Sequence, residues 1–369
     1  MKLAIILFNL GGPDGPDAIK PFRVNLFSDP AIIRAPGFVR FFLARFIASL
    51  KVKEAIANYQ LLGGKSPLLD ITTRQARALE AALPEIDARA FVTMRYWHPF
   101  AAEVAAEVKT FDPDEILLLP LYPQFSTTTT GSSVSDWHEA ASKAGLMKKT
   151  QILCCYFDDP AYIASVAGQV RQGLANARAG LPAGGPLRVL FSAHGLPESI
   201  ILSGDPYQEE VEKSVAAVMA TLGEPELDYQ VCYQSRATPQ QWLTPSTEDA
   251  IEKAAHDKTA VLVVPIAFVS DHIETLVELD VEYRHVADEL GVPGYFRAPV
   301  ANDDPAFITA LAGLVRRTIA SEQPLCSHKG GRACSLKNKN CLFAKRKQQD
   351  VAAQPPFLSV VKPTELAAE

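Results

Sequence analysis

Three glutamates spaced four residues apart follow an apolar run late in the chain. Glu274, Glu278 and Glu282 would share one face of a helix, because side chains at i, i+4 and i+8 stack along it. Carboxylates at that spacing repel one another, so such a row suits either a solvated face or a path for cations or protons. The row directly follows residues 261–264, which read as a buried parallel strand. Since α/β proteins bind ligands at the carboxyl ends of such strands, we predict a functional row, with His272 as a further group able to bind metal or protons.

A second candidate for chemistry is His194, at the end of another apolar strand pattern, residues 187–191. A lone histidine is usually structural, but Gly195 and Pro197 predict a tight turn that would fix this imidazole at the edge of the sheet. Its pKa near neutrality suits proton transfer or binding of a divalent metal. If both strands belong to one sheet, His194 and Glu274 would face each other across a cleft.

The composition is that of an enzyme-sized globular protein. The chain has 369 residues, 48% of them hydrophobic and 21% charged, which allows one large or two ordinary domains. A net charge of −6 argues against a general nucleic-acid binder. The sequence shows no apolar run of membrane-spanning length and no signal peptide pattern. Six cysteines are too few for a disulfide scaffold, so we expect a cytoplasmic, reducing location.

Alternating strand and helix patterns predict an α/β fold with parallel sheets. The expected strands are 3–8, 90–94, 115–119, 187–191 and 261–264, and the expected helices are 68–83, 100–109, 207–222 and 305–320. A strand, a proline-containing loop and a polar helix occur in that order near 116–136 and again near 261–283, which suggests two similar halves. We place these halves at 1–150 and 151–323, followed by a basic, cysteine-containing extension and tail at 324–369.

Three further segments could shape a pocket. Residues 38–50 are rich in Phe, Leu, Ile and Ala, which fits either a buried helix or a hydrophobic lip at a pocket mouth. The hydroxyl-rich segment 127–133 follows a buried strand and would line a polar pocket. Residues 63–66, Gly-Gly-Lys-Ser, lack the preceding strand and the glycine spacing of a phosphate-binding loop, so we exclude a nucleotide site.

Taken together, these motifs resemble those of the ferrochelatases, enzymes that insert Fe²⁺ into protoporphyrin IX to form protohaem. The similar stretches run in the family's order over residues 3 to 320: Asn9-Leu-Gly-Gly-Pro13, Tyr59 with Gly63-Gly-Lys-Ser-Pro67, Met94-Arg-Tyr96, Pro120-Leu-Tyr-Pro-Gln124 with Thr129-Thr-Gly-Ser-Ser133, Ser192-Ala-His-Gly-Leu-Pro197, Gly204-Asp-Pro-Tyr207, Tyr233-Gln-Ser235 with Trp242-Leu, and Ser270-Asp-His-Ile-Glu-Thr-Leu276. The motifs around His194 and Glu274 are the most specific. The resemblance implies a chelatase-like fold, with two similar Rossmann-like halves and a porphyrin cleft between them.

The resemblance also implies roles for individual residues. His194 and Glu274 match the active-site pair, which could also bind the iron, and Glu278 and Glu282 match an acidic line that leads to the surface. Substrate contacts are matched by Tyr59, Ser66 and Ser235 near the porphyrin propionates and by Arg95, Tyr96, Trp242 and Phe268 in the pocket wall. The chain departs from the family pattern at Lys65, Tyr233 and Thr244, which puts the shape of the pocket in doubt more than its chemistry.

Metallation requires that two pyrrole protons leave the macrocycle and that the iron loses its water. We expect His194 to accept protons on one face, while Glu274, His272 and the glutamate row handle iron or protons on the other. Fe²⁺ is a substrate, and no organic cofactor is required. The expected partners are protoporphyrin IX and Fe²⁺, with peripheral membrane contact for porphyrin delivery left open and with no nucleic acid; the chain would be a monomer or a homodimer. Coproporphyrin or another tetrapyrrole, Co²⁺ or Ni²⁺ insertion, and a non-catalytic haem or porphyrin carrier stay as alternatives.

Three cysteines lie close together in the extension. Some ferrochelatases carry a [2Fe–2S] cluster in such an extension, which makes Cys326, Cys334 and Cys341 its candidate ligands. Animal members place an upstream ligand where this chain has Thr127. A fourth ligand would have to come from Cys154, Cys155, Cys232, His328 or elsewhere. The three cysteines among these lie in strand-like apolar runs, which favours buried structural thiols. Free thiols and a zinc site are the alternatives.

Overall fold

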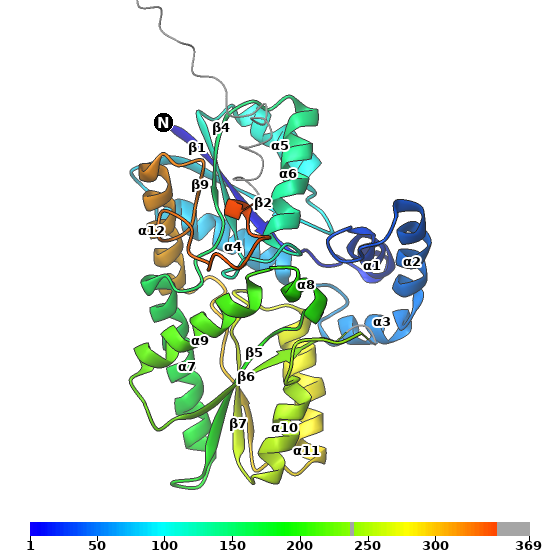
Figure 1. Ribbon diagram of the computed structural model, residues 1–369, viewed down its shortest axis with the longest axis vertical. Coiled ribbons are helices and arrows are strands. Elements are labelled where there is room, and N and C mark those ends of the chain that lie inside the picture. Colours follow the sequence, from blue (N-terminus) through cyan, green and yellow to red (C-terminus); the bar gives the residue numbers. More distant parts are fainter. Residues whose placement is uncertain (237–239, 345–369) are drawn as a thin grey trace, which may run out of the picture.

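Two parallel sheets lie one above the other in the computed structural model, which describes residues 1–236 and 240–344 (Figure 1). The first sheet has the order β2 (Asp87–Met94), β1 (Lys2–Asn9), β3 (Glu115–Pro120), β4 (Lys149–Leu153) and β9 (Leu325–Cys326). The second has the order β6 (Asp228–Gln234), β5 (Leu187–His194), β7 (Ala260–Pro265) and β8 (Tyr295–Arg297). Every pair of neighbouring strands is parallel, which confirms the expected fold class.

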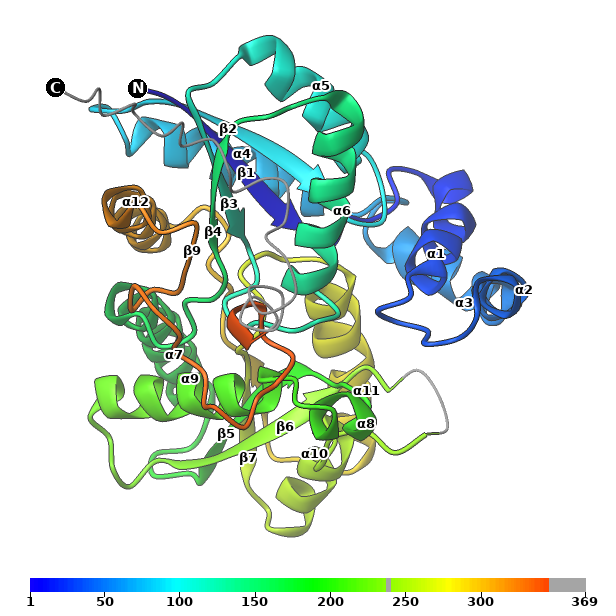
Figure 2. The same ribbon diagram turned by 45° about the horizontal axis from the view of Figure 1, so that its top comes forward.

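Helices cover both faces of the first sheet, which is why its central strand is apolar throughout. Successive side chains of a strand point to opposite faces. On β1, Leu3, Ile5 and Leu7 accordingly pack toward α4 (Leu68–Ala81) and α12 (Pro305–Ser321). The intervening residues pack toward α5 (Ala101–Phe111) and α6 (Thr130–Ala144). Figure 2 shows these two helical layers on either side of the strands.

The second sheet lies between α7 (Pro160–Gly180) and α9 (Tyr207–Leu222) on one face and α10 (Thr247–His256) and α11 (Tyr283–Glu289) on the other. The short helix α8 (Glu198–Leu202) precedes α9. Pairing of β5 with both β6 and β7 brings His194, Gln234 and Pro265 to the same carboxyl edge of this sheet. That edge faces the first sheet, and the position of His194 there follows directly from the register.

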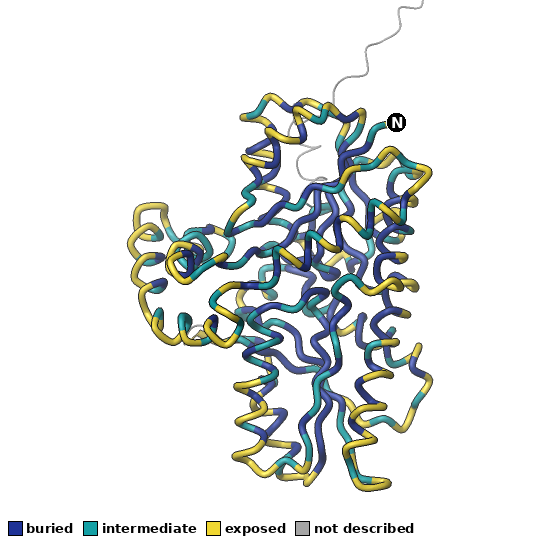
Figure 3. Tube along the Cα trace, turned by 180° about the vertical axis from the view of Figure 1, so that it is seen from behind, coloured by how far each residue is buried: buried dark blue, intermediate teal, exposed yellow. Residues whose placement is uncertain are grey.

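Three helices project from the side of the first sheet: α1 (Ile19–Ser28), α2 (Gly37–Ser49) and α3 (Val52–Leu61). The short 3₁₀ turn η1 (Pro16–Ala18) leads into them. On α2 only two alanines are buried, whereas Phe38, Phe42 and Phe46 are 73%, 69% and 63% exposed. Figure 3 shows how much of this projecting unit is exposed compared with the strands. The apolar segment 38–50 is therefore a surface helix, and the buried-helix alternative is wrong.

Two features differ from the sequence-based expectations. The segment after β7 is not an ordinary α-helix: Glu274–Glu282 form a π-helix, η2, that continues into α11. The first sheet also extends past the expected boundary at residue 150, because β4 crosses it and β9 comes from the extension. The tail expected after Ala352 lies outside the described residues.

Candidate active site

A cavity of about 170 Å³ opens between the two halves, and its wall is mostly apolar. The first half contributes Leu26 and Ile32 from the projecting unit and Thr128 from the loop before α6. The second half contributes His194 and Glu274. The two residues singled out for chemistry therefore lie on the wall of a single pocket, at the carboxyl edge where α/β proteins bind ligands.

His194 and Glu274 are in direct contact. His194 Nδ1 and Glu274 Oε2 are 2.8 Å apart, although the residues come from the end of β5 and the start of η2. Tyr207 on α9 donates a hydrogen bond from its hydroxyl to the backbone oxygen of His194 at 3.0 Å, which fixes the end of the strand. No macrocycle fits between groups that touch, so the expectation that the pair faces each other across a cleft is wrong. Both side chains lie on the same side of the cavity.

The pair has the electrostatics of an ion pair. Burial alone would raise the pKa of Glu274, but the charge and hydrogen bond of His194, helped by His272, outweigh it and lower that pKa. Burial alone would lower the pKa of His194, but Glu274 outweighs it and raises that pKa. His272 lies beside the pair, with Nε2 3.8 Å from Glu274 Oε2, while its Nδ1 donates to the carbonyl of Ser270 at 3.1 Å. The site thus holds a carboxylate whose two neighbours are imidazoles.

The second glutamate of the row lies in a cage of donors. Glu278 Oε2 accepts hydrogen bonds from Ser235 Oγ at 2.5 Å and from Gln234 Nε2 at 2.9 Å, and Oε1 accepts from the Tyr283 hydroxyl at 3.0 Å. Burial, with the negative charge of Glu274, nevertheless raises the pKa of Glu278. This group is therefore easier to protonate than an ordinary glutamate, as a proton acceptor next to Glu274 should be.

The third glutamate lies at the surface. Glu282 Oε1 accepts a hydrogen bond from Asn58 Nδ2 at 2.7 Å, and Asn58 belongs to α3 of the projecting unit. The row thus runs from the ion pair, through the partly buried Glu278, to an exposed carboxylate. This order matches the expected acidic line between pocket and surface.

Two of the expected substrate residues lie at the cavity or close to Glu274. Phe268 lines the cavity, with its ring centroid 4.7 Å from that of His272. Tyr59 is buried on α3, and burial together with the charge of Glu274 raises its pKa, which places its hydroxyl within electrostatic reach of that carboxylate. Ser235, whose backbone is left-handed (φ 65°), donates its hydroxyl to Glu278, and its contact with substrate stays a prediction.

The other expected substrate residues contact protein groups beside the cavity. Arg95 Nη2 lies 2.9 Å from Asp29 Oδ2, and the Tyr96 hydroxyl donates to the same oxygen at 2.8 Å, which ties the end of α1 to the first sheet. Ser66 packs so tightly on Gly12 that a Cβ at Gly12 would lie 2.5 Å from its hydroxyl. Trp242 is half-buried, and its backbone bridges that of Pro197. Contact of these four residues with substrate stays a prediction.

Two contributors to the site were not selected as site residues from the sequence. Gln234 binds both the Glu278 carboxylate and the backbone oxygen of Glu274, and Tyr207 both lines the cavity and holds the end of β5. Each lies inside a motif that resembles the family's, at Tyr233-Gln-Ser235 and Gly204-Asp-Pro-Tyr207. That membership was the available signal, because the contacts themselves join residues far apart in sequence.

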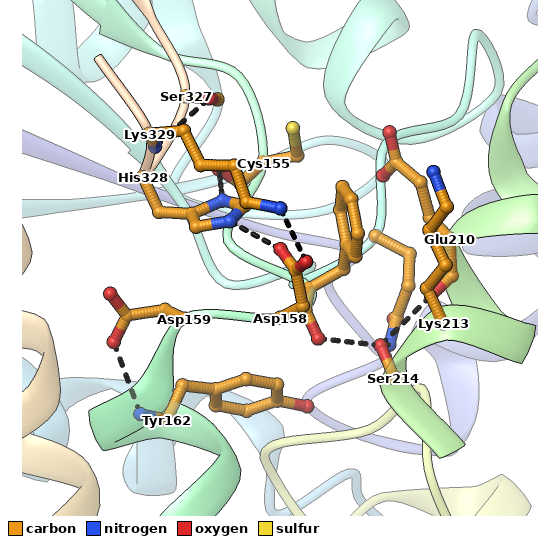
Figure 4. Close-up of polar contacts among 12 residues, drawn as sticks. Cys155, Asp158, Asp159, Tyr162, Glu210, Lys213, Ser214, Ser327, His328 and Lys329 are labelled. Carbon is orange, nitrogen blue, oxygen red and sulfur yellow. Dashed lines mark hydrogen bonds and ion pairs between the residues drawn. The ribbon is translucent and has the colours of Figure 1, made fainter. Parts of the chain in front are cut away.

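The extension is bound to the body of the protein at two carboxylates. Asp158 pairs with His328 and, at 2.5 Å, with Lys329 Nζ (Figure 4). His328 also uses Nδ1 on the carbonyl of Cys155, at 3.3 Å, so both of its ring nitrogens are occupied. A separate carboxylate on α9, Glu209, accepts hydrogen bonds from the side chains of Ser335 at 2.8 Å and Asn338 at 2.9 Å. These contacts hold residues 327–338 against the body of the protein.

Four thiols meet where the extension packs on the loop after β4. Cys154 and Cys155 have their sulfurs 3.3 Å apart and share a buried cluster with Cys334 and Cys341. A hydrogen bond with Cys154, together with burial, raises the pKa of Cys155. A hydrogen bond from Cys334 lowers the pKa of Cys341 to about 7. Cys326 packs in a different cluster, with Sγ 3.7 Å from Thr318 Oγ1.

Within residues 1–236 and 240–344, no three His, Cys, Asp or Glu side chains converge in a way that would hold a metal ion. In the same part of the chain, no helix has the length and apolar character needed to cross a membrane.

The family profile and two of the most similar relatives in sequence are described as ferrochelatases. The ferrochelatase family profile matches residues 2–319. A ferrochelatase of Phenylobacterium zucineum is 50% identical over 349 residues, which cover 92% of this chain and 99% of that protein. A ferrochelatase of Caulobacter vibrioides is 48% identical over 344 residues, which cover 92% and 97%. The solved structure of SirB from Bacillus subtilis with Fe³⁺ covers 87% of this chain and 97% of its own, with a TM-score of 0.52; at 13% identity it shows the fold alone.

Proposed function

Since the chain belongs to the ferrochelatase family, whose enzymes insert Fe²⁺ into a porphyrin in haem synthesis, we propose that protoporphyrin IX binds between its halves with one face against His194 and Glu274. The resemblance seen in the sequence is confirmed, and so is the assignment as an iron-inserting lyase. The observation that carries the proposed placement is the 2.8 Å contact between the two residues on the cavity wall.

Proton removal falls to His194. A base works best when it gains a proton readily yet can pass it on, and the adjacent carboxylate of Glu274 stabilises the imidazolium that forms. This is the physical meaning of the raised pKa of His194. The imidazole must be neutral to accept a pyrrole proton, so each cycle requires that the previous proton has left.

The glutamate row gives that proton a way out. Glu278 follows Glu274 by one turn, and its raised pKa lets it hold a proton while Glu274 stays charged. Glu282 then releases the proton at the surface. The imidazole of His194 and the carboxylate of Glu274 can also bind Fe²⁺ transiently. These ligands hold Fe²⁺ less tightly than thiolates do, which suits an enzyme that must release its product.

Glutamine in place of Glu278 or Glu282 should lower turnover in a graded manner. We expect a loss of roughly tenfold for Glu278→Gln, because the amide cannot carry the proton, and a smaller loss for Glu282→Gln, because water can replace an exposed carboxylate. Both losses should be below that of Glu274→Gln. Steady-state haem formation measures them. Equal and negligible effects at both positions would instead support a merely solvated acidic face.

The choice of substrate is a finer question within the same chemistry. We propose protoporphyrin IX and Fe²⁺, and parallel assays with coproporphyrin, Co²⁺ and Ni²⁺ test this choice. Insertion that is fastest with coproporphyrin or with another metal would replace the proposed substrate but keep the roles of His194 and Glu274. A haem or porphyrin carrier would have no use for a raised-pKa base beside a carboxylate.

We further propose that α2 rests on a membrane surface and receives the apolar porphyrin there. Its exposed phenylalanines are accompanied by exposed Arg45 and Lys51, the combination typical of helices that lie in an anionic bilayer surface. The cavity is lined by Leu26 and Ile32, which belong to the same projecting unit as α2. The cytoplasmic location and the monomeric or homodimeric state stay proposals beside it.

Replacing Phe38, Phe42 and Phe46 together with serine should abolish flotation with vesicles that contain anionic phospholipid, because it removes the apolar face. Turnover with detergent-dispersed porphyrin should change little. A matched control changes two equally exposed leucines elsewhere, Leu202 (80%) and Leu336 (82%), to serine and should leave flotation unchanged. Flotation that survives the triple change would contradict the proposal.

We propose that the cysteine cluster holds a [2Fe–2S] group. The group takes four thiolates, and Cys154, Cys155, Cys334 and Cys341 share one buried site, although no three of them are arranged to hold a metal ion in the described residues. Arg332 lies beside Cys334 and Cys341, and its Nε is buried with no hydrogen-bond partner, so a neighbouring anion would satisfy it. When bound, the group would supply a redox-active crosslink between extension and body. Of the three candidate ligands implied by the resemblance, the proposed set keeps Cys334 and Cys341 and leaves out Cys326, which packs in a different cluster.

Protein purified without oxygen should then be reddish, with absorption bands beyond those of any bound haem. Cys334→Ser should abolish these bands and expose residues 326–341 to protease, because metal ligation couples to local folding. Cys232→Ser, in the core of the second sheet, is the matched control and should keep them. Loss of the bands in Cys326→Ser but not in Cys155→Ser would restore Cys326 as a ligand. Colourless protein without iron or sulfide, from cells able to build clusters, would contradict the proposal.

A further inference from the structure

The π-helix η2 that begins with Glu274 needs outside support. π-helices are rare because their hydrogen-bond pattern is unfavourable on its own, and most are single turns within α-helices. η2 extends over nine residues, from Glu274 to Glu282. Something beyond its own backbone must therefore hold it in this form.

Strand β8 contacts the helix through two side chains. The Tyr295 hydroxyl donates to the backbone oxygen of Leu279 at 2.6 Å, so a π-helical carbonyl is bonded from outside. Arg297 makes a two-pronged contact with Asp280, from Nε to Oδ1 at 2.6 Å and from Nη2 to Oδ2 at 2.8 Å. Its third nitrogen, Nη1, lies 3.4 Å from Oδ1 of Asp271.

The two aspartates bound by Arg297 lie on either side of the catalytic turn. Asp271 precedes η2, and Asp280 lies near its end. Asp271 Oδ1 also accepts a hydrogen bond from the Thr275 hydroxyl at 2.9 Å, and Thr275 is the residue after Glu274. One guanidinium therefore links the start of the helix to its end, at a side chain that is only 13% exposed.

We propose that Arg297 is a positioning residue that holds η2 in register and thereby keeps the Glu274 carboxylate against His194. It touches neither the cavity nor the pair, so it acts only through the helix. The inference rests on the proposed roles of His194 and Glu274. Lysine cannot reproduce the planar two-pronged contact, so even the conservative change Arg297→Lys should lower activity.

The chain also contains a matched control for the simpler explanation, in which Arg297 contributes only to the stability of the fold. Arg188, at the start of β5, is 12% exposed and pairs with two aspartates, Asp228 at 2.7 Å and Asp257 at 2.9 Å. It lies at the opposite end of the strand that ends in His194. Replacing Arg188 should remove about as many ion-pair contacts as replacing Arg297, but these contacts do not involve η2 or the active site.

The test compares Arg297→Met, Arg297→Lys and Arg188→Met in the full-length enzyme. We expect Arg297→Met to lower kcat for haem formation on the order of tenfold, because small displacements of a catalytic group have large kinetic effects, with KM for porphyrin nearly unchanged. Arg297→Lys should recover part of the loss. Arg188→Met should lower the melting temperature about as much as Arg297→Met does, but should leave kcat unchanged. Asp280→Asn should reproduce most of the loss in Arg297→Met, and the double variant should be no worse than Arg297→Met, since the Asp280 contact is already lost there.

A kcat of Arg297→Met equal to that of wild type, or a kcat that falls equally in Arg188→Met, would overturn the inference. So would independent, additive losses for Arg297 and Asp280. These outcomes are distinct from failure of the proposed function. In that case wild type itself would form no haem, or His194→Ala would remain active.

Discussion

Replacing His194 with alanine should abolish haem formation. We expect kcat to fall by at least about 100-fold, the lower end of what a positioned general base contributes. The change removes the group that accepts the pyrrole protons but little core volume, because the imidazole faces the cavity. Porphyrin binding, followed by fluorescence, and the thermal melting temperature should stay close to those of wild type.

His256→Ala is the control for a histidine change as such, since that side chain is 90% exposed on α10 and should have no effect. Wild-type turnover in His194→Ala would contradict the proposed role of His194 as the base. Loss of porphyrin binding along with turnover would show that the residue binds substrate rather than moves protons.

The second large effect is expected for Glu274→Gln. The amide has the shape of the carboxylate but no charge, so it can neither stabilise the imidazolium nor accept a proton, and we expect a loss on the order of 100-fold. The pH dependence gives an independent readout. Glu274 raises the pKa of His194, so its neutralisation should lower that pKa. The rising limb of kcat/KM, which reports the neutral base, should then move to lower pH in the residual activity.

Glu289→Gln, on an exposed carboxylate at the end of α11, controls for the loss of a negative charge nearby. Its turnover and its pH profile should match those of wild type. A rising limb that does not move in Glu274→Gln would show that the carboxylate does not tune His194, whatever the loss of turnover.

The sequence was sufficient to predict that His194 and Glu274 lie at one edge of a sheet, but not that they are in direct contact. His194 and Glu274 each follow a buried apolar strand, and parallel strands of one sheet end at a common edge. The strands are short apolar runs bounded by turn residues, and their positions were correct. Helix α9 covers the predicted residues 207–222, because its apolar residues repeat with helical periodicity.

Other features depend on contacts that no local pattern carries. The spacing of the glutamates predicts an α-helix, and the π-helix instead reflects support from Tyr295 and Arg297 on a later strand. The contact of Arg95 with Asp29 joins residues 66 positions apart, so no local pattern predicts it. The apolar segment 38–50 reads the same whether buried or exposed, and only the fold showed which.

The proposed function is tested most directly by anaerobic incubation of the purified protein with Fe²⁺ and protoporphyrin IX, followed by pyridine haemochrome spectra over time. We expect protohaem in many-fold excess over protein, formed far faster than in a protein-free control and lost in His194→Ala. Porphyrin that binds to the protein but yields haem no faster than in the protein-free control would contradict it.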